Sequence, residues 1–420
     1  MKSIRFIDLF AGCGGLSEGF IQAGYTPIAH VEMDKAACYT LRTRSAFHWL
    51  CAHNKNGEYA KYLNGEIPRA DLYAQVPKEV LDTIINEEIG DESLPRIFSQ
   101  IDSLTKGGKV DLIVGGPPCQ AYSLIGRAKD ANGMIGDSRN YLFRYYAMFL
   151  KHYAPKLFVF ENVLGLLSAK DKNGKKYLDM MLEEFNRLGY KTVYKILNAD
   201  DYGVPQKRKR IILLGAKDAP RDWSFPTIEE KPYAFTVGDM LADIPSLSSG
   251  GVSVPFKVKG RRRRAVLETR VADSEFPVTQ HIARPHTQQD LEIYKRAVQL
   301  WNKDRARLSY KNLPDALRTH NNISSFLDRF KVVAADLRCC HTIVAHIARD
   351  GHYYIHPDIK QNRSLSVREA ARLQTFPDNY YFEGIKERQC RTAAFRQIGN
   401  AVPVLLAYHI AESLKENWHE

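Results

Sequence analysis

A cysteine stands directly after two glycines and two prolines in the stretch GGPPCQAYS, residues 115–123. The residues before it, VDLIV, form an apolar run typical of a buried parallel strand. A cysteine that only packs in the core would lie inside such a run, because a free thiol behaves there as a small hydrophobic group. Cys119 follows the run, at the position where strands of open α/β sheets meet their ligands. The placement indicates a nucleophilic thiol, with a packing cysteine as the alternative.

A thiol nucleophile needs cationic neighbours, because an unperturbed cysteine is only about 3% thiolate at neutral pH. The stretch QKRKR, residues 206–210, supplies two candidates, Arg208 and Arg210. They occupy alternate positions at the start of an apolar run, so in a strand both side chains face the same way. The alternative is a solvated basic strand edge.

A carboxyl group ends another apolar run, FVFENV, residues 158–163. Partial burial of Glu161 at such a strand end would disfavour its charged form. The group could then donate a proton or a hydrogen bond at neutral pH. The alternative is a structural acid.

A glycine-rich turn, DLFAGCGG, follows the first apolar run at residues 8–15. This layout brings the backbone close to a bound nucleotide, although Ser17 stands where the dinucleotide fingerprint has its third glycine. A second run ends at Glu32, 20 residues after Gly12, where an acid can accept hydrogen bonds from ribose hydroxyls. The pattern suits an adenosine-containing cofactor without a pyrophosphate. The alternative is a tight turn beside a surface glutamate.

The first half of the chain alternates strand-like and helical segments and predicts a doubly wound, Rossmann-like α/β sheet. Strands are expected in IRFIDLF, PIAHVE, VDLIVGG, KLFVFENV, KTVYKILNA and RIILLG. Asp34 and Ser138 are expected helix N-caps, and Ser366 with Glu369 forms a capping box. A polar segment at about 52–98 reads as an insertion between strands.

The alternation ends near residue 224, where a region rich in proline, serine and arginine begins. We therefore expect a catalytic and cofactor-binding domain over 1–224, a smaller inserted domain over 225–335, and a return to the first domain over 336–420. The net charge is +12, from 60 Lys and Arg against 48 Asp and Glu. Residues 225–335 hold 18 basic and 12 acidic residues, or half of the excess, which favours a polyanion such as nucleic acid over a merely solvated surface.

The bulk properties exclude other classes of protein. Seven cysteines in 420 residues do not make a disulfide framework, and no apolar stretch reaches transmembrane length. The first residues are too weakly apolar for a secretory signal, so a cytoplasmic protein is expected. Cys339 and Cys340 precede several histidines, but adjacent cysteines do not match zinc-finger spacings, and no metal is expected.

Together these motifs resemble the cytosine-5 DNA methyltransferases, which use S-adenosylmethionine. The resemblance covers nearly the whole chain: DLFAGCGG is similar to the family's cofactor loop, GGPPCQ to its nucleophile loop and ENV to its acidic motif. QKRKRIILLG is similar to the arginine motif, RSLSVREAARLQTFPD to the late helical motif, and QIGNAVP to the closing motif. All six occur in the family's order.

The resemblance implies a mechanism. The Cys119 thiolate adds to C6 of cytosine, and C5 then takes the methyl group, leaving S-adenosylhomocysteine. Glu161 holds N3 and the exocyclic amine, Arg210 contacts O2 of the base, and Arg208 contacts a phosphate or the nucleophile. The target base must be flipped out of the helix to be reached.

The resemblance also implies binding residues. Cofactor contacts are expected from Phe10, Ala11, Gly12, Gly14, Gly15, Leu16, Glu32, Met33, Gln100, Ile101, Pro118, Leu142, Asn400 and Val402. DNA contacts are expected from Gln120, Ser123, Arg261, Arg262, Arg263 and Arg264. Gln100 replaces the family's usual acid at the adenine amino group, and Asp102 is the alternative ligand. Cys13 is expected to line the cofactor loop rather than react.

The inserted domain matches the family's target-recognition domain, and the compact chain resembles a prokaryotic restriction–modification enzyme. The expected partners are double-stranded DNA and a separately acting restriction endonuclease, with the enzyme itself a monomer. Two other functions remain open: an RNA cytosine-5 methyltransferase, against which the long basic insertion argues, and a non-catalytic DNA-binding relative, against which the four catalytic candidates argue.

Overall fold

The computed structural model describes residues 3–118, 141–258, 264–273, 275–319, 323–388 and 390–418. In this part of the chain, seven strands form one sheet in the order β3-β2-β1-β4-β5-β7-β6. The strands are β1 Arg5–Leu9, β2 Thr26–Glu32, β3 Ile84–Asn86, β4 Leu112–Gly115, β5 Leu157–Asn162, β6 Tyr190–Asn198 and β7 Lys209–Lys217. All six expected strands form, and the predicted Rossmann-like α/β sheet is confirmed.

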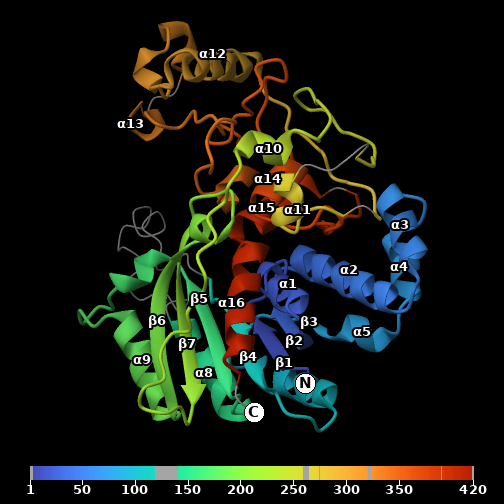
Figure 1. Ribbon diagram of the computed structural model, residues 1–420, viewed down its shortest axis with the longest axis vertical. Helices are drawn as coiled ribbons and strands as arrows, with labels where there is room; N and C mark the ends of the chain where they lie inside the picture. Colours follow the sequence, from blue (N-terminus) through green and yellow to red (C-terminus); the bar gives the residue numbers. More distant parts are fainter. Residues whose placement is uncertain are drawn as a thin grey trace.

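The sheet is mixed rather than wholly parallel. β1 to β5 pair in parallel, whereas β7 runs antiparallel to both β5 and β6. The strand order reverses between β1 and β4, and sheets of this kind bind their ligands at the carboxyl ends of the strands beside such a reversal. In Figure 1 those ends point upward, toward the layer that contains α10, α14 and α15.

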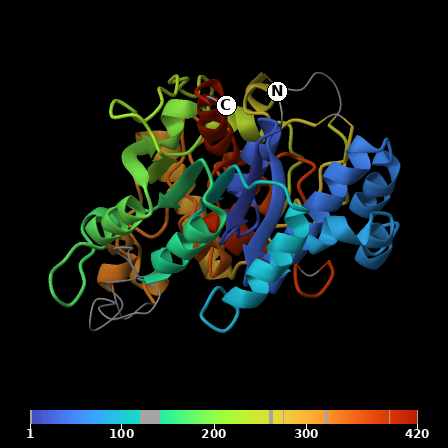
Figure 2. The same cartoon turned by 90° about the horizontal axis from the view of Figure 1, so that it is seen from below.

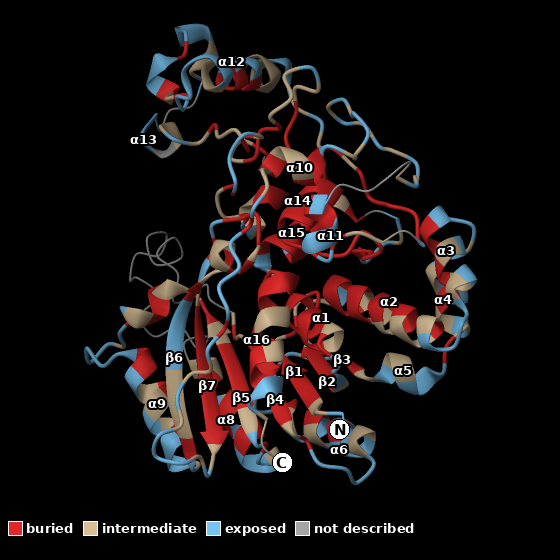
Figure 3. Ribbon diagram, in the orientation of Figure 1, coloured by how far each residue is buried: buried red, intermediate tan, exposed pale blue. Residues whose placement is uncertain are grey.

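Helices cover both faces of the sheet, as Figure 2 shows in a view along the strands. On one face lie α6 Leu94–Thr105, α8 Leu142–Tyr153 and α9 Tyr177–Arg187; on the other lie α1 Gly15–Gln22 and α16 Val404–Glu416. The central strands are buried and β6 is partly exposed along one edge (Figure 3). Gly19 lets α1 approach α16 closely, since a Cβ there would lie 2.5 Å from that of Ala407.

A second layer lies over the carboxyl ends of the strands. It contains α10 Val237–Leu241, α11 Arg264–Glu268, α14 Val367–Leu373 and α15 Arg391–Asn400, whose apolar residues share one core. Residues from 233 to 271 and from 333 to 404 both contribute to that core. Beyond it, α12 Gln288–Asp304 and α13 Ile323–Phe326 belong to a smaller core that includes Ile355 (Figure 1).

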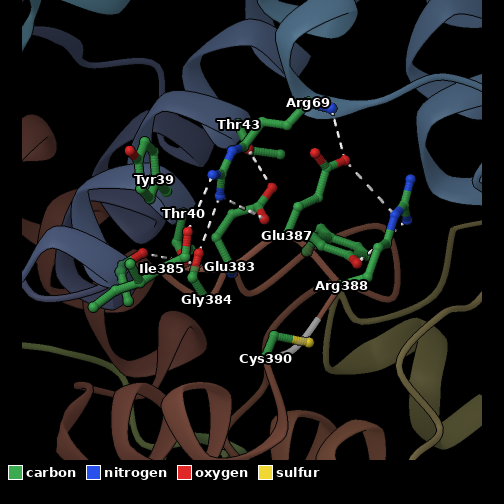
Figure 4. Close-up of polar contacts among 12 residues, drawn as sticks. Tyr39, Thr40, Thr43, Arg69, Glu383, Gly384, Ile385, Glu387, Arg388 and Cys390 are labelled. Atoms are coloured by element: carbon green, nitrogen blue, oxygen red, sulfur yellow. Dashed lines mark hydrogen bonds and ion pairs between the residues drawn. The ribbon is translucent and has the colours of Figure 1, made fainter.

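The expected insertion at 52–98 is helical and also supplies the edge strand β3. After α2 Lys35–Ala52 come α3 Asn56–Asn64, α4 Arg69–Ala74 and α5 Lys78–Asp82. The buried carboxylate of Glu383 holds α2, α3 and α4 to the segment between α14 and α15 (Figure 4). It accepts hydrogen bonds from Thr43 Oγ1 (2.7 Å) and the Tyr62 hydroxyl and pairs with Arg69 (3.4 Å). The insertion thus adds β3 to the sheet and packs its helices against α2 and Tyr381, which follows α14.

Short 3-10 helices lie in the connections, at Leu164–Leu167, Ala199–Tyr202, Tyr310–Asn312, Asp315–Leu317 and Ala345–Ala348. Two predicted N-terminal signals are confirmed. Asp34 accepts from the backbone N–H of Ala37 (2.9 Å), and Ser366 and Glu369 form the capping box of α14. The third, Ser138, lies outside the described residues. No described helix combines the length and the apolar character needed to cross a bilayer.

Buried ion pairs fix the second layer. Both carboxylate oxygens of Glu369 accept from the Arg363 guanidinium at 2.7 Å, and both residues are buried. Burial alone would raise the pKa of Glu369, but His356 and Arg363 outweigh it and hold the pKa well below the usual 4.5. Glu369 is therefore charged in the folded protein, at the first turn of α14.

Acid should release this pair. A lowered folded-state pKa gives stability that is complete above about pH 4.5, the unfolded value, and is lost as the pH falls through the folded-state pKa. In urea unfolding at neutral pH, Glu369→Gln should cost about 3–5 kcal/mol, because Arg363 stays buried without its counter-ion. The variant should also lose less stability than the native chain between pH 5 and 3. The control is Glu79→Gln, at an exposed site, whose stability should depend on pH as that of the native protein does. An equally steep pH dependence in Glu369→Gln would contradict this account.

Candidate active site

The glycine-rich turn adopts a conformation that few side chains tolerate. Phe10, Gly12 and Gly14 have φ values of 57°, 56° and 83°, and the Gly14 N–H donates to the Ala11 carbonyl (2.9 Å). Glu32, at the end of β2, braces this turn. One carboxylate oxygen accepts from the Gly12 N–H (2.8 Å) and the other from the Asp34 N–H (2.7 Å). The two motifs that the sequence analysis paired for one cofactor are therefore in direct contact.

The closing motif packs on the same turn from the far end of the chain. A Cβ atom at Gly15 would lie 2.4 Å from the Val402 carbonyl oxygen and 3.0 Å from the Ala401 Cβ. Glycine is thus required where the two segments cross. Val402 is buried, whereas Asn400, the last residue of α15, is exposed. Residues 10–16, Glu32 and residues 400–402 consequently surround one end of β1.

The remaining cofactor candidates lie in different places. Met33 follows Glu32 and is exposed, and Leu142 begins α8. Gln100 is exposed in the middle of α6, and Ile101 is buried against the sheet. In Figure 3, α6 lies toward the amino ends of the strands. Asp102, the alternative to Gln100, is exposed and pairs with His152 (3.3 Å).

Two residues near the turn were missed by the sequence analysis. Asn86, at the end of β3, donates to the carbonyls of Glu32 (3.1 Å) and Met33 (3.0 Å), so it occupies the strand end beside the turn. Asp8 is buried within β1, beside the Ser17 side chain. Burial raises its pKa well above the usual value. A charged residue inside an apolar strand was the available signal for Asp8.

These features fit a cationic, adenosine-containing cofactor. The backbone turn leaves open space at Gly12, where a Cβ would touch nothing within 4 Å. Glu32 offers carboxylate oxygens for a ribose, and a positive charge close to the buried Asp8 carboxyl would favour its ionised form. These acidic groups therefore suit S-adenosylmethionine, whose sulfonium and ammonium groups are positive.

The segment that leads to the nucleophile is held against β1 and β5. Gly115 has φ 155°, and a Cβ there would lie 2.2 Å from the Leu9 carbonyl oxygen. A Cβ at Gly116 would lie 2.6 Å from Glu161 Oε2. The Asn162 side chain donates to the Pro117 carbonyl (3.3 Å). Described structure ends at Pro118; Cys119, Gln120 and Ser123 lie outside it.

Glu161 and Arg210 form an ion pair with 2.6 Å between Oε1 and Nε. Antiparallel pairing of β5 with β7 sets this contact, because Asn162 lies opposite Ile211 and Glu161 opposite Ile212. The side chains of Arg210 and Glu161 are 11% and 15% exposed, so solvent reaches the pair. A partly accessible carboxylate thus lies beside the nucleophile segment and is oriented by one guanidinium.

Arg208 is placed differently from Arg210. Its side chain is buried and donates to the carbonyls of Ile343 (2.7 Å) and Gly399 (3.2 Å). The guanidinium therefore joins the start of β7 to two segments: the one that contains Ile343 and the closing motif, which contains Gly399. Among the DNA candidates, Arg264 begins α11 and pairs with Glu268, and Arg261, Arg262 and Arg263 lie outside the described residues.

Two buried glutamines, also missed from sequence, connect three motifs. Gln206 donates to the Leu373 carbonyl and to Gln374 Oε1, both at 3.2 Å, and accepts from the Ile343 N–H (2.9 Å). Gln374 in turn donates to the Ile398 carbonyl (2.7 Å). The arginine motif, the late helical motif and the closing motif are thus fastened together above the sheet.

The six cysteines in the described part of the chain have surroundings that disfavour the thiolate. Cys13 is buried, and burial raises the pKa of its thiol far above the usual range. Cys339 and Cys340 are buried too, and burial raises the pKa of Cys339 to about 11. Within the described ranges, no three His, Cys, Asp or Glu side chains are arranged to hold a metal.

Comparison with known proteins identifies the family. The chain matches the C-5 cytosine-specific DNA methylases over residues 4–73 and 70–416. It is 39% identical to the type II methyltransferase M.Bpa9945I of Bacillus paralicheniformis, covering 98% of each chain. It is 30% identical to the type II methyltransferase M.DdeI of Desulfomicrobium norvegicum, covering 99% of this chain and 89% of the relative. The chain therefore belongs to the family of C-5 cytosine-specific DNA methylases.

Solved structures agree on the fold. A DNA modification methyltransferase encoded within an E. coli prophage superposes with a TM-score of 0.61 at 22% identity, with 99% of both chains covered. The Entamoeba histolytica methyltransferase EhMeth gives a TM-score of 0.56 at 14% identity, covering 100% of both chains. The expected enzyme class, a DNA cytosine-5 methyltransferase, is confirmed by the family match.

Gly116 offers a direct test of the site geometry. In Gly116→Ala the new methyl group would lie 2.6 Å from Glu161 Oε2 and 2.7 Å from its backbone oxygen, so the nucleophile segment or Glu161 must move. A displacement of about 1 Å should lower kcat about 10²-fold. Calorimetry should find unchanged binding of S-adenosylmethionine, because the glycine-rich turn is not altered. Gly57→Ala, in the open surface of α3, is the matched control. Equal kcat in both variants would refute the packing described here.

Proposed function

We propose that this enzyme transfers a methyl group from S-adenosylmethionine to C5 of a flipped-out cytosine in a short, specific sequence of duplex DNA. The observation that carries the proposal is the contact of the nucleophile segment with Glu161, which Arg210 orients. This contact lies at the carboxyl ends of β4 and β5. The glycine-rich turn lies at the end of β1, which pairs with β4.

Each residue at the carboxyl ends has a chemical task in this proposal. The Cys119 thiolate adds to C6 of cytosine, and a new C–S bond forms as the ring gains electron density at C5. Glu161 holds the N3 edge and the exocyclic amine, so it offsets the charge that develops on the ring. Arg210 fixes the Glu161 carboxylate and reaches the base O2. C5 then takes the methyl group, leaving S-adenosylhomocysteine, and transfer of the C5 proton to water re-forms the double bond and expels the thiolate.

The cofactor is held by the residues that surround the end of β1. Bound S-adenosylmethionine supplies an electrophilic methyl group on a sulfonium centre. Glu32 would accept hydrogen bonds from the ribose hydroxyls, and the turn at residues 10–16 and the closing segment at 400–402 would hold the rest of the cofactor. Burial raises the pKa of Asp8, and the positive charge of the cofactor would favour the ionised form of this carboxyl. The contact of Glu32 with Gly12 supports this shared site.

Residues 225–335 are proposed as the target-recognition domain, with Arg261 to Arg264 contacting phosphates. Because the relatives are named type II methyltransferases, we propose a restriction–modification role in the cytoplasm beside a separate endonuclease that cuts the same sequence. The enzyme is proposed to act as a monomer. The description of the matched family, C-5 cytosine-specific DNA methylases, favours DNA over RNA as the substrate.

A mechanism-based trap tests the covalent step. Once sequencing of methylated DNA has defined the target, a duplex with 5-fluorocytosine at that position should form an adduct that survives denaturing electrophoresis. Fluorine cannot leave as a cation, so the thiolate cannot be expelled after methyl transfer. The adduct should require S-adenosylmethionine and map to Cys119 by peptide mass spectrometry.

Two variants complete the trapping experiment. Cys119→Ser should form no adduct, because a hydroxyl is a much weaker nucleophile at neutral pH. Cys13→Ser should still form it, because Cys13 is buried and its pKa is raised. An adduct at Cys13, or none on a sequence that the enzyme methylates, would overturn the proposed mechanism.

A further inference from the structure

A short hairpin projects between β5 and α9. Its two ends are anchored, since Ala169 and Tyr177 are both buried and the Tyr177 N–H donates to the Ala169 carbonyl (3.1 Å). A bridge between Lys170 and Lys176 continues the pairing outward. We call residues 168–176 the lysine hairpin. The 3-10 helix Leu164–Leu167 joins it to the end of β5, where Glu161 and Asn162 lie.

The turn of the lysine hairpin is stiffened by its only acid. Asp171 Oδ1 accepts from the backbone N–H groups of Asn173 (2.9 Å) and Lys175 (2.8 Å). The Gly174 N–H donates to the Asp171 carbonyl (3.1 Å), and Gly174 has φ 82°, which favours glycine. A rigid turn presents its side chains with less loss of backbone entropy on binding than a flexible loop does.

The lysine hairpin concentrates positive charge. Lys170, Lys172, Lys175 and Lys176 are exposed, against the single Asp171. Lys175 pairs with Glu183 at 2.6 Å. No described acid forms an ion pair with Lys170, Lys172 or Lys176. Three like charges held close together on a fixed turn repel one another, and a bound polyanion would relieve that repulsion.

The position of the hairpin fits a long ligand that also reaches the active site. It leaves the sheet from the carboxyl end of β5, the end that carries Glu161. Figures 1 and 2 both show it reaching outward on the same flank as α12 and α13, which lie beyond the second layer. An extended polyanion along this flank would meet both the hairpin and these helices.

We infer that the lysine hairpin binds the phosphate backbone of the DNA duplex beside the target cytosine. The inference rests on the proposed function and adds a DNA contact on the catalytic domain, outside residues 225–335. Lysine ammonium groups bind phosphates as point charges, so these contacts position the duplex without reading its sequence. They release counterions, and the affinity therefore becomes more dependent on salt.

The test compares two triple variants with the same loss of charge. Lys170→Gln, Lys172→Gln and Lys176→Gln are combined in one protein. The control combines Lys106→Gln, Lys109→Gln and Lys151→Gln, exposed residues that precede β4 and β5 at the amino ends of these strands. Fluorescence anisotropy measures the Kd for a duplex that contains the target, over a series of salt concentrations.

In the hairpin variant the slope of log affinity against log salt should become shallower by about 0.9 for each lost phosphate contact. The control slope should change much less. A variant with arginine at the three hairpin positions should keep the native slope. With a duplex whose flanks are shortened, the native protein and the hairpin variant should have the same salt slope. Their kcat at saturating DNA should also be the same.

Equal slopes of log affinity against log salt in the hairpin and control variants would overturn the inference, because any change would then come from the loss of net charge and not from the hairpin. A hairpin effect on RNA binding alone would overturn it too. These failures differ from failure of the proposed function, in which the native protein would methylate no DNA at all. An unchanged thermal unfolding midpoint in both triple variants verifies that the comparison is made on folded protein.

Discussion

Hydrogen bonds of two buried glutamines join the chain segments that cover the carboxyl ends of the strands. Gln206 and Gln374 contact each other, and through Ile343 and Ile398 they join chain segments nearly 200 residues apart. A buried amide that loses its partner keeps the cost of desolvation, so each of these contacts favours the same arrangement of segments. Arg208 adds two bonds to the same junction. The carboxyl ends of the strands are therefore covered by a layer whose position is fixed.

That constraint explains why small residues matter at the strand ends. The closing segment crosses the glycine-rich turn at Gly15, and the nucleophile segment meets Glu161 at Gly116, in each case too closely for a Cβ atom. Neighbouring strands place these two crossings side by side. The result is a glycine-rich turn and a carboxylate–guanidinium pair at adjoining positions.

Much of this was predictable from sequence. Long apolar runs predicted six strands correctly, and local chemistry predicted the Asp34 N-cap and the Ser366–Glu369 capping box, because both depend on residues three positions apart. β3 was missed, since three residues give too short a run for periodicity to detect. Gln100 was assigned by motif matching across the insertion, and the structure places it in the middle of α6.

Long-range partners were beyond the sequence. The alternation of Arg208 and Arg210 predicted a shared face, but Arg208 reaches carbonyls 135 and 191 residues away, while Arg210 meets Glu161 across one strand pair. Such contacts depend on how layers pack, and no local pattern encodes them. Asp8 is different, because an acidic residue inside an apolar strand is visible in the sequence.

The central claim is that this enzyme methylates cytosine at C5 in duplex DNA, with residues at the carboxyl ends of the strands. Incubating the purified protein with S-adenosylmethionine carrying a labelled methyl group and with mixed-sequence duplex DNA tests it most directly, with nucleoside mass spectrometry as the readout. The label should appear in 5-methyldeoxycytidine and should be absent when Cys119→Ser replaces the native chain. Label on N4 of cytosine, on N6 of adenine, or in 5-methylcytidine of added RNA but not in the DNA would contradict the account.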